Sequence, residues 1–202
     1  MNFLQANTER SRAKVRVQIA RAAACGFVLL FATAAHLMMP HASAQVPSGR
    51  DVVAPTALVS YDPVARGKEF QIAVVMKIRD GFHVNARKKS AEYLIATDLK
   101  TEGATGFKIG DVTYPEGELH TFSFSKTPLN VYEHTVVLKL PVTALADAPT
   151  GAQHIPLKLR YQACSNEVCL PPVTLPVDVT VNVADTATAA HPAHPDVFQA
   201  PR

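Results

Sequence analysis

Apolar and polar residues alternate with a period of two along much of the chain from Ala57 onward. In the clearest run, Glu69–Ile78, every second position is apolar: Phe70, Ile72, Val74, Met76 and Ile78. Such alternation is typical of a strand with one buried face, because successive side chains of a strand point to opposite sides. Together with the turn residues between them, the runs predict these extended segments: Ala57–Tyr61, Glu69–Ile78, Phe82–Asn85, Tyr93–Leu99, Thr105–Val112, Leu119–Phe124, Val131–Pro141, Gln153–Gln162 and Val173–Val183.

Helical periodicity is nearly absent from this part of the chain. Windows with apolar residues at helical spacing contain a proline or a glycine. Turn signals such as Asp62-Pro63 and Arg79-Asp80-Gly81 recur at intervals of roughly ten residues, and prolines lie near strand ends. The pattern predicts an all-β protein, an immunoglobulin-like antiparallel β-sandwich.

The N-terminal region has the pattern of an export signal. Basic residues precede an apolar run from Ala22 to Met39, and Ala42-Ser43-Ala44 has the small-x-small pattern of a signal-peptidase site. An uncleaved membrane anchor is the alternative, since the run is close to the length that spans a bilayer. Pro40 and the small residues after it favour cleavage, which predicts a signal peptide over residues 1–44.

The expected signal peptide changes the charge and the domain boundaries. It contains five of the 20 Lys and Arg residues and one of the 17 acidic residues, so the rest of the chain is close to neutral. A nucleic-acid partner, which requires a basic surface, is therefore not expected. We expect a linker at 45–55, one domain at 56–184 and a disordered tail at 185–202, because the tail is poor in apolar residues.

Two cysteines follow the expected signal peptide, Cys164 and Cys169, with four residues between them. They lie between the expected strands Gln153–Gln162 and Val173–Val183, so they should face each other across a hairpin turn at a distance that permits a disulfide. Exported proteins meet oxidising conditions, which favour that bond. A disulfide that closes so short a loop removes little chain entropy, and no tryptophan is present to pack on a staple between sheets.

Several functions remain open at this point. The pair could be a redox tool, or a permanent clip in a non-catalytic immunoglobulin-like binding or chaperone module. A copper-handling domain is less well supported, because Met76 is the one methionine after residue 44. Two cysteines supply half of a structural zinc site, and a c-type haem would need Cys-x-x-Cys-His. No metal or cofactor is therefore expected.

The sequence around the cysteines resembles a known family. Four motifs carry the resemblance, in this order: Asp80–Asn85, Tyr114-Pro115-Glu116-Gly117, Tyr161-Gln162-Ala163-Cys164 and Cys169-Leu170-Pro171-Pro172. Together they are similar to the N-terminal periplasmic domain of the thiol:disulfide interchange protein DsbD and its stand-alone relatives. The resemblance covers roughly Thr56 to Val183. It implies an immunoglobulin-like domain that accepts electrons from a membrane-embedded thiol donor and passes them to periplasmic thioredoxin-like or disulfide-isomerase proteins, with a link to cytochrome c biogenesis.

The resemblance also implies roles for individual residues. Cys164 and Cys169 match the redox pair, with Cys169 expected to form the mixed disulfide and Cys164 to resolve it. Thr121–Lys126, with Phe122 and Phe124, falls where the family has a cap loop over the pair, although core packing explains these two residues equally well. His83 and Asn85 fall where well-known members have tyrosines.

Other nearby residues have simpler explanations. His83 could accept a proton near the cysteines, whereas a solvent-facing strand histidine is the commoner case. Tyr161 is expected to pack beneath the pair with its hydroxyl bonded.

The chain also differs from the family pattern. The best-known member has five residues between its cysteines, and the expected cap lacks an acidic residue beside its aromatics. The sequence ends after the first domain of the full-length family protein, so we expect electrons to come from a separate protein. No sequence feature indicates an oligomer, and a monomer is expected.

Overall fold

The computed structural model describes residues 47–185 and 190–199. The expected signal peptide lies outside this range. The described elements, in order, are η2 (Gly49–Asp51), β1 (Val53–Val59), β2 (Val64–Ala65), β3 (Glu69–Ile78), β4 (His83–Asn85), β5 (Asp98–Thr101), β6 (Phe107–Ile109), β7 (Glu118–His120), β8 (Leu129–Tyr132), β9 (Thr135–Ala144), β10 (Gly151–Tyr161), β11 (Ala163–Cys164), β12 (Val173–Ala184) and α2 (Pro195–Phe198).

Two of the three sheets formed by the described residues enclose the core. One has the strand order β1-β3-β9-β6 and the other β2-β12-β10-β5, and their pairings are antiparallel except for β12 with the short β2. In β10 and β12 the buried residues alternate with exposed ones, as the period-two pattern predicts. Alternate residues of both sheets form one apolar cluster, in which Ile72, Leu138 and Leu159 are completely buried. The predicted all-β, immunoglobulin-like antiparallel β-sandwich is confirmed.

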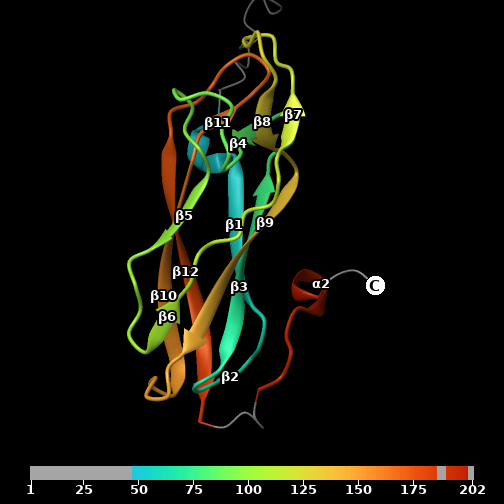
Figure 1. Ribbon diagram of the computed structural model, residues 1–202. Helices are drawn as coiled ribbons and strands as arrows, with labels where there is room; N and C mark the ends of the chain where they lie inside the picture. The colour runs from blue at the N-terminus through green and yellow to red at the C-terminus, as the bar shows by residue number, and fades with distance from the viewer. Residues whose placement is uncertain (1–46, 186–189, 200–202) are drawn as a thin grey trace, which may run out of the picture. The chain divides into compact units, whose positions relative to one another are not determined.

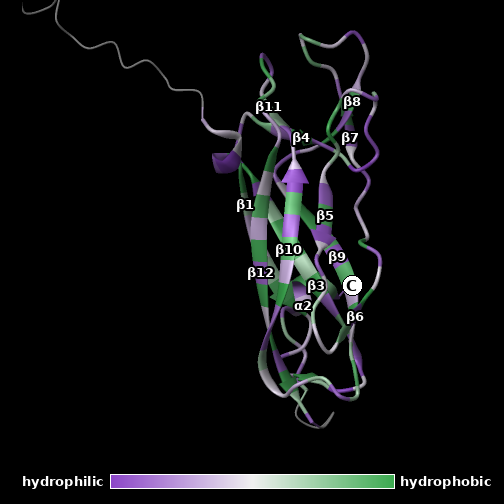
Figure 2. Ribbon diagram, turned by 90° about the vertical axis from the view of Figure 1, so that its left-hand side faces the viewer, coloured by the Kyte–Doolittle hydropathy of each residue, from purple (hydrophilic) through white to green (hydrophobic). Residues whose placement is uncertain are grey.

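A smaller third sheet lies at one end of the sandwich. Its order is β11-β4-β8-β7, with antiparallel pairs throughout. Figure 1 shows β4, β7, β8 and β11 gathered beyond the ends of the long strands, and the same arrangement is visible in the rotated view of Figure 2. This sheet brings together segments that are far apart in the sequence, and it contains Cys164.

Some predicted strands are shorter or divided. The extended region Tyr93–Leu99 is strand only from Asp98, and Leu119–Phe124 is strand only as far as His120. The segment Val131–Pro141 is divided into β8 and β9 at His134, whose φ is 56°. A left-handed residue at this point turns the chain, and the carbonyl of His134 accepts a hydrogen bond from the amide of Ile78 at 2.7 Å.

The predicted linker at 45–55 is wrong for its described part. Val52 and Val53 are 1% and 3% exposed, and β1 begins at Val53 and pairs with β3. The buried hydroxyl of Tyr161 donates a hydrogen bond to the carbonyl of Gly49 at 2.8 Å, which fastens η2 to the domain. The polar turn residues of this stretch predict a linker. The apolar pair Val52-Val53 does not change that prediction, because two residues are too few to show the alternation of a strand.

Part of the predicted disordered tail is ordered in the structure. The amide of Ala193 donates to the carbonyl of Ser60 at 2.9 Å, and the amide of Asp62 donates to the carbonyl of His191 at 3.0 Å. The single turn α2 follows this crossing. Residues 190–199 therefore continue the pairing just beyond the end of β1, an arrangement that composition alone does not reveal.

Candidate functional site

The two cysteines are joined by a disulfide at the end of the hairpin formed by β10 and β12. Cys164 and Cys169 form an isolated antiparallel bridge with their Cα atoms 3.9 Å apart. The amide of Ser165 donates to the carbonyl of Val168 at 2.8 Å, which closes the turn between them. The hydroxyl of Ser165 accepts hydrogen bonds from the amides of Glu167 and Val168, both at 3.2 Å. Local hydrogen bonds thus shape the turn.

The two cysteines differ in their exposure to solvent. Cys164 is 1% exposed, because β11 lies between β4 and the turn. Cys169 is partly exposed and lies on the returning side of the turn. A second sulfur can approach Cys169 more readily than Cys164.

His83 lies directly beside the disulfide. It faces Cys164 in the pairing of β4 with β11, and it is 1% exposed. Burial lowers the pKa of His83 to about 4, with a smaller contribution from the nearby His120. The imidazole is therefore neutral near pH 7. The simpler explanation from the sequence, a solvent-facing strand histidine, is wrong.

Two aromatic residues of the segment Thr121–Lys126, which we call the cap segment, cover His83. The ring of Phe122 stacks on the imidazole with centroids 3.9 Å apart and an interplanar angle of 18°. The ring of Phe124 is nearly parallel to both and lies to one side of the pair, with its centre 5.4 Å from Phe122 and 6.3 Å from His83. Phe122 is 6% exposed, whereas Phe124 is 41% exposed. The ring of Phe122 is thus enclosed, and the ring of Phe124 meets solvent.

Phe122 packs against two sets of neighbours. Besides covering His83, it belongs to a small apolar cluster separate from the main core, whose other buried members are Leu94, Leu129 and Val131. The cap segment lies outside the sheets, so its position depends on this cluster and on side-chain hydrogen bonds.

One of these hydrogen bonds joins the cap segment to the cysteine turn. The hydroxyl of Ser123 donates to the carbonyl of Asn166 at 2.7 Å, across 43 positions of sequence. Sequence reasoning missed this contact, because a serine between two phenylalanines gives no signal of a long-range partner. It fastens the segment that covers His83 to the turn that contains the disulfide.

Asn85 supports the site from the other end of β4. Its carbonyl accepts hydrogen bonds from the amide of Thr97 at 3.1 Å and from the hydroxyl of Thr97 at 2.7 Å. Its side-chain amide donates to the carbonyl of Ile95 at 3.1 Å. Asn85 is 1% exposed and does not contact the cysteines through any of these bonds. These hydrogen bonds hold the 95–97 loop against β4, so the observed role of Asn85 is structural.

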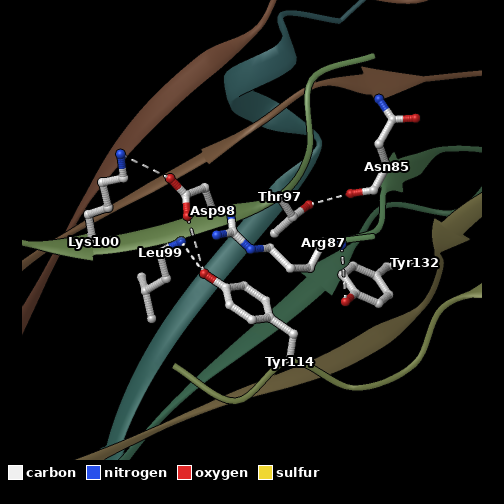
Figure 3. A network of polar contacts seen from close by, with 8 residues as sticks. All are labelled: Asn85, Arg87, Thr97, Asp98, Leu99, Lys100, Tyr114 and Tyr132. Carbon is white, nitrogen blue, oxygen red and sulfur yellow. Dashed lines mark hydrogen bonds and ion pairs between the residues drawn. The ribbon is translucent and has the colours of Figure 1, made fainter. Parts of the chain in front are cut away.

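A polar network continues from Asn85 along the same segment (Figure 3). Arg87 forms an ion pair with Asp98 at 2.7 Å, and its guanidinium lies 5.1 Å from the ring centre of Tyr114. The hydroxyl of Tyr114 accepts a hydrogen bond from the amide of Leu99 at 2.9 Å. The Tyr114-Pro115-Glu116-Gly117 motif therefore fixes the chain that leads to β7 and the cap segment, and sequence reasoning did not find these partners.

Gly117 explains why this motif ends in glycine. A Cβ atom there would lie 2.7 Å from the Cβ of Ala86 and would also collide with the side chain of Asn130. Asn130 in turn donates to the carbonyl of Lys88 at 2.8 Å. The close approach keeps the start of β7 against the end of β4.

Tyr161 is the last residue of β10, and its hydroxyl has a hydrogen-bond partner, as expected from the sequence. It is completely buried, and burial raises the pKa of its hydroxyl to about 12. The hydroxyl donates to the carbonyl of Gly49. Tyr161 thus packs in the core at the base of the cysteine hairpin.

Within the described residues, no cluster of three or more His, Cys, Asp or Glu side chains is arranged to hold a metal ion. The described part of the chain also has no helix long and apolar enough to cross a membrane.

Comparison with known families identifies the family to which this chain belongs. The family model described as thiol:disulfide interchange protein DsbD, N-terminal, matches residues 50–180. The chain belongs to this family. DsbD from Haemophilus ducreyi is 25% identical over 131 residues, which are 65% of this chain and 20% of the relative. The chain thus spans about a fifth of the length of that DsbD.

Solved structures with related folds were also found. One is the complex between the DsbD N-terminal and PilB N-terminal domains from Neisseria meningitidis, with a TM-score of 0.43, 24% identity, and coverage of 68% of this chain and 88% of that one. Another is the N-terminal periplasmic domain of ScsB from Proteus mirabilis, with a TM-score of 0.40, 14% identity, and coverage of 63% of this chain and 46% of that one. Membership of the DsbD N-terminal family agrees with the resemblance found around the cysteine motif.

Proposed function

We propose that this DsbD-type domain transfers electrons by thiol-disulfide exchange through Cys164 and Cys169. One observation carries the proposal. The disulfide, in which Cys169 is partly exposed, lies beside the cap segment, and that segment is held by side-chain contacts and not by sheet pairing. A segment held in this way can move without breaking the sandwich, because the strands of the core do not depend on it.

The position of the disulfide argues against a mainly structural role. Both cysteines lie in the same hairpin, so their bond does not connect the two sheets that enclose the core. A loop of this length yields little of the entropic stabilisation that a disulfide between distant segments gives. The core of the domain is already a single large apolar cluster.

The exchange step follows from the difference in exposure. In the reduced domain, the thiolate of Cys169 attacks a sulfur of the oxidised partner, and the partner's other sulfur leaves as a thiolate. Cys164 then attacks Cys169, which re-forms the Cys164–Cys169 bond and releases the partner's second sulfur. Two electrons pass from the cysteine pair to the partner, which ends as a dithiol.

The partners we propose are proteins with a comparable cysteine pair. On one side is a membrane-embedded thiol donor that reduces the domain, and on the other are oxidised periplasmic proteins of thioredoxin-like or disulfide-isomerase type, including those of cytochrome c biogenesis. Phe124 and Val168 are 41% and 47% exposed and lie on the two segments joined by the Ser123–Asn166 hydrogen bond. Exposed apolar side chains beside a reactive pair suit the docking of another protein. This function requires export to the periplasm by the signal peptide at 1–44.

The first test is the reduction potential of the cysteine pair. The chain is equilibrated in dithiothreitol buffers, and free thiols are counted by mass after alkylation. We expect a potential within the range of exchange proteins, about −180 to −270 mV. A potential below about −300 mV, typical of structural disulfides, would instead indicate a permanent clip in a binding or chaperone module.

A trapping experiment then tests the partners. Cys164→Ala leaves Cys169 to form a mixed disulfide that cannot be resolved, while Cys169→Ala serves as the matched control. We expect the first variant to accumulate mixed disulfides with periplasmic proteins that carry a cysteine pair, and the second to accumulate far fewer. Equal trapping by both variants would contradict the assignment of Cys169 as the attacking residue.

A further inference from the structure

Three residues form a row across neighbouring strands at the site. His83 faces Cys164 in the pairing of β4 with β11, and Cys164 faces Cys169 in the bridge across the turn. Directly opposed residues of antiparallel strands project their side chains to the same face of the sheet. The imidazole is therefore a neighbour of the buried cysteine and not of the solvent.

The imidazole has an unused nitrogen. Nε2 of His83 is buried and has no hydrogen-bond partner among the residues that the structure describes. Buried side-chain nitrogens are usually bonded, so an unbonded one next to a reactive group calls for an explanation. A neutral imidazole has one nitrogen that accepts a proton, and the thiol of reduced Cys164 is a proton donor.

The surroundings of His83 determine when it can accept that proton. Phe122 covers one face of the ring, Cys164 lies across the strand pair, and the ring centre of Phe124 lies 6.3 Å away. The ring centre of His120 lies 6.2 Å from that of Phe122. His120 is itself near the carboxylates of Glu118 and Glu133, at 3.3 and 3.5 Å. No hydrogen bond or ion pair from a described carboxylate reaches His83. An imidazolium at this position would be buried and uncompensated, so the closed cap segment keeps His83 a weak base.

We propose that His83 is the proton acceptor for Cys164 in the resolving step of exchange, and that Phe122 keeps it inactive until the cap segment moves. This rests on the proposed function. When Cys169 is bonded to a partner, the proton of the Cys164 thiol moves to Nε2 of His83. The Cys164 sulfur attacks Cys169, the Cys164–Cys169 bond forms, and the bond from Cys169 to the partner breaks. The partner sulfur leaves as a thiolate and takes up a proton from water, and the imidazolium returns its proton to water.

Movement of the cap segment supplies the control. Once Phe122 leaves the ring, water reaches the imidazole and its basicity returns toward that of an ordinary histidine, whose pKa is near 6.5. A base of that strength is well matched to a thiol near neutral pH. A docked partner thus activates Cys164 only where a mixed disulfide is present to be resolved.

The test uses the reduced full chain and the aromatic disulfide DTNB, which releases a coloured thiolate at each step. Attack by Cys169 releases the first thiolate, and attack by Cys164 on the mixed disulfide releases the second. The two rates are measured by stopped flow from pH 5 to pH 9. In this assay the aromatic group bonded to Cys169 takes the place of the docked partner beside the cap segment. In the wild type we therefore expect the second rate to rise through an inflection between pH 6 and 7, where a hydrated histidine loses its proton.

Two substitutions separate a chemical role from a structural one. His83→Phe keeps an aromatic ring beneath Phe122 and leaves no unbonded nitrogen, so the fold should be retained. We expect the second rate at pH 7 to fall at least tenfold, because general bases typically contribute 10²–10⁴, and the inflection to disappear, with the first rate little changed. His83→Ala should behave alike and regain activity when imidazole is added. His120→Gln removes the other histidine near Phe122, which does not face Cys164 in the strand pairing, so it is the matched control and should keep the inflection.

The outcomes distinguish this proposal from the proposed function. If His83→Phe resolves the mixed disulfide within twofold of the wild-type rate at every pH, the role of His83 is refuted and the exchange function stands. A wild type that never releases the second thiolate would overturn the exchange function, and the role of His83 with it.

Discussion

Ser123 and Asn166 are joined by a hydrogen bond of 2.7 Å from the serine hydroxyl to the asparagine carbonyl. The bond connects the cap segment to the turn between the two cysteines. Because it is made by one side chain to one main-chain oxygen, removing the hydroxyl removes the connection and leaves the turn intact.

Ser123→Ala should increase the rate at which dithiothreitol reduces the disulfide. A single hydrogen bond contributes about 0.5–1.5 kcal/mol, which corresponds to a roughly two- to tenfold larger population of the open cap segment. The rate constant is measured by thiol alkylation. Ser125→Ala is a matched control, because that hydroxyl bonds to the carbonyl of Thr127 two residues away. An equal acceleration in both variants would mean that Ser123 has no special part in closure.

Phe122→Ala and Phe124→Ala should differ in their effect on stability. Phe122 is 6% exposed and packs on His83 and in the small apolar cluster, so its truncation should cost about 3–5 kcal/mol of unfolding free energy. Phe124 is 41% exposed, and its loss should cost less than about 1 kcal/mol. Urea denaturation measures both. Similar values for the two variants would contradict the distinction between an enclosed and an exposed ring.

Stability should fall as the pH is lowered from about 6.5 to 4, with His83 responsible for part of the loss. Its folded pKa, about 4, is below the ordinary value of 6.5, so between these values the unfolded chain binds a proton that the folded chain does not. The stabilisation is present above pH 6.5 and declines by up to about 1.4 kcal/mol per pH unit below it. Urea denaturation at pH 7, 6 and 5 should show a smaller decline in His83→Phe than in the wild type. Parallel declines would refute the contribution.

Tyr161→Phe should destabilise the domain by about 1–3 kcal/mol. The substitution removes the hydroxyl that bonds to the carbonyl of Gly49 and leaves that acceptor without its partner. Thermal or urea unfolding measures the effect. Tyr93→Phe is the control, since Tyr93 is 77% exposed and its change should be close to neutral. An unchanged stability in Tyr161→Phe would show that η2 is not held by this bond.

Gly117→Ala should disturb the start of β7. The added methyl group would collide with Ala86 and Asn130, and overpacking of this kind typically costs about 1–3 kcal/mol. Because β7 leads directly into the cap segment, reduction of the disulfide should also become faster, in the same assay as for Ser123→Ala. A variant that is destabilised but reduced at the wild-type rate would show that the cap segment is positioned independently of Gly117.

The long strands were predictable because their signal is local. The bounds of β3 were obtained from alternation alone, and β10 and β12 were close, since each buries one face against a single core. The short strands at the end of the sandwich were less well predicted. Their three or four residues are too few to establish a period, and their pairing partners lie far away in the sequence.

The sequence by itself determined the all-β sandwich and the hairpin with Cys164 and Cys169 at its end, because alternation, turn residues and spacing are all written within a few positions. Only the tertiary structure decided that His83 is buried against Cys164, that Phe122 covers it and that Ser123 reaches Asn166. These contacts join segments separated by tens of residues. Their formation depends on how the sheets pack and which polar atoms are left to pair, and no local pattern encodes that.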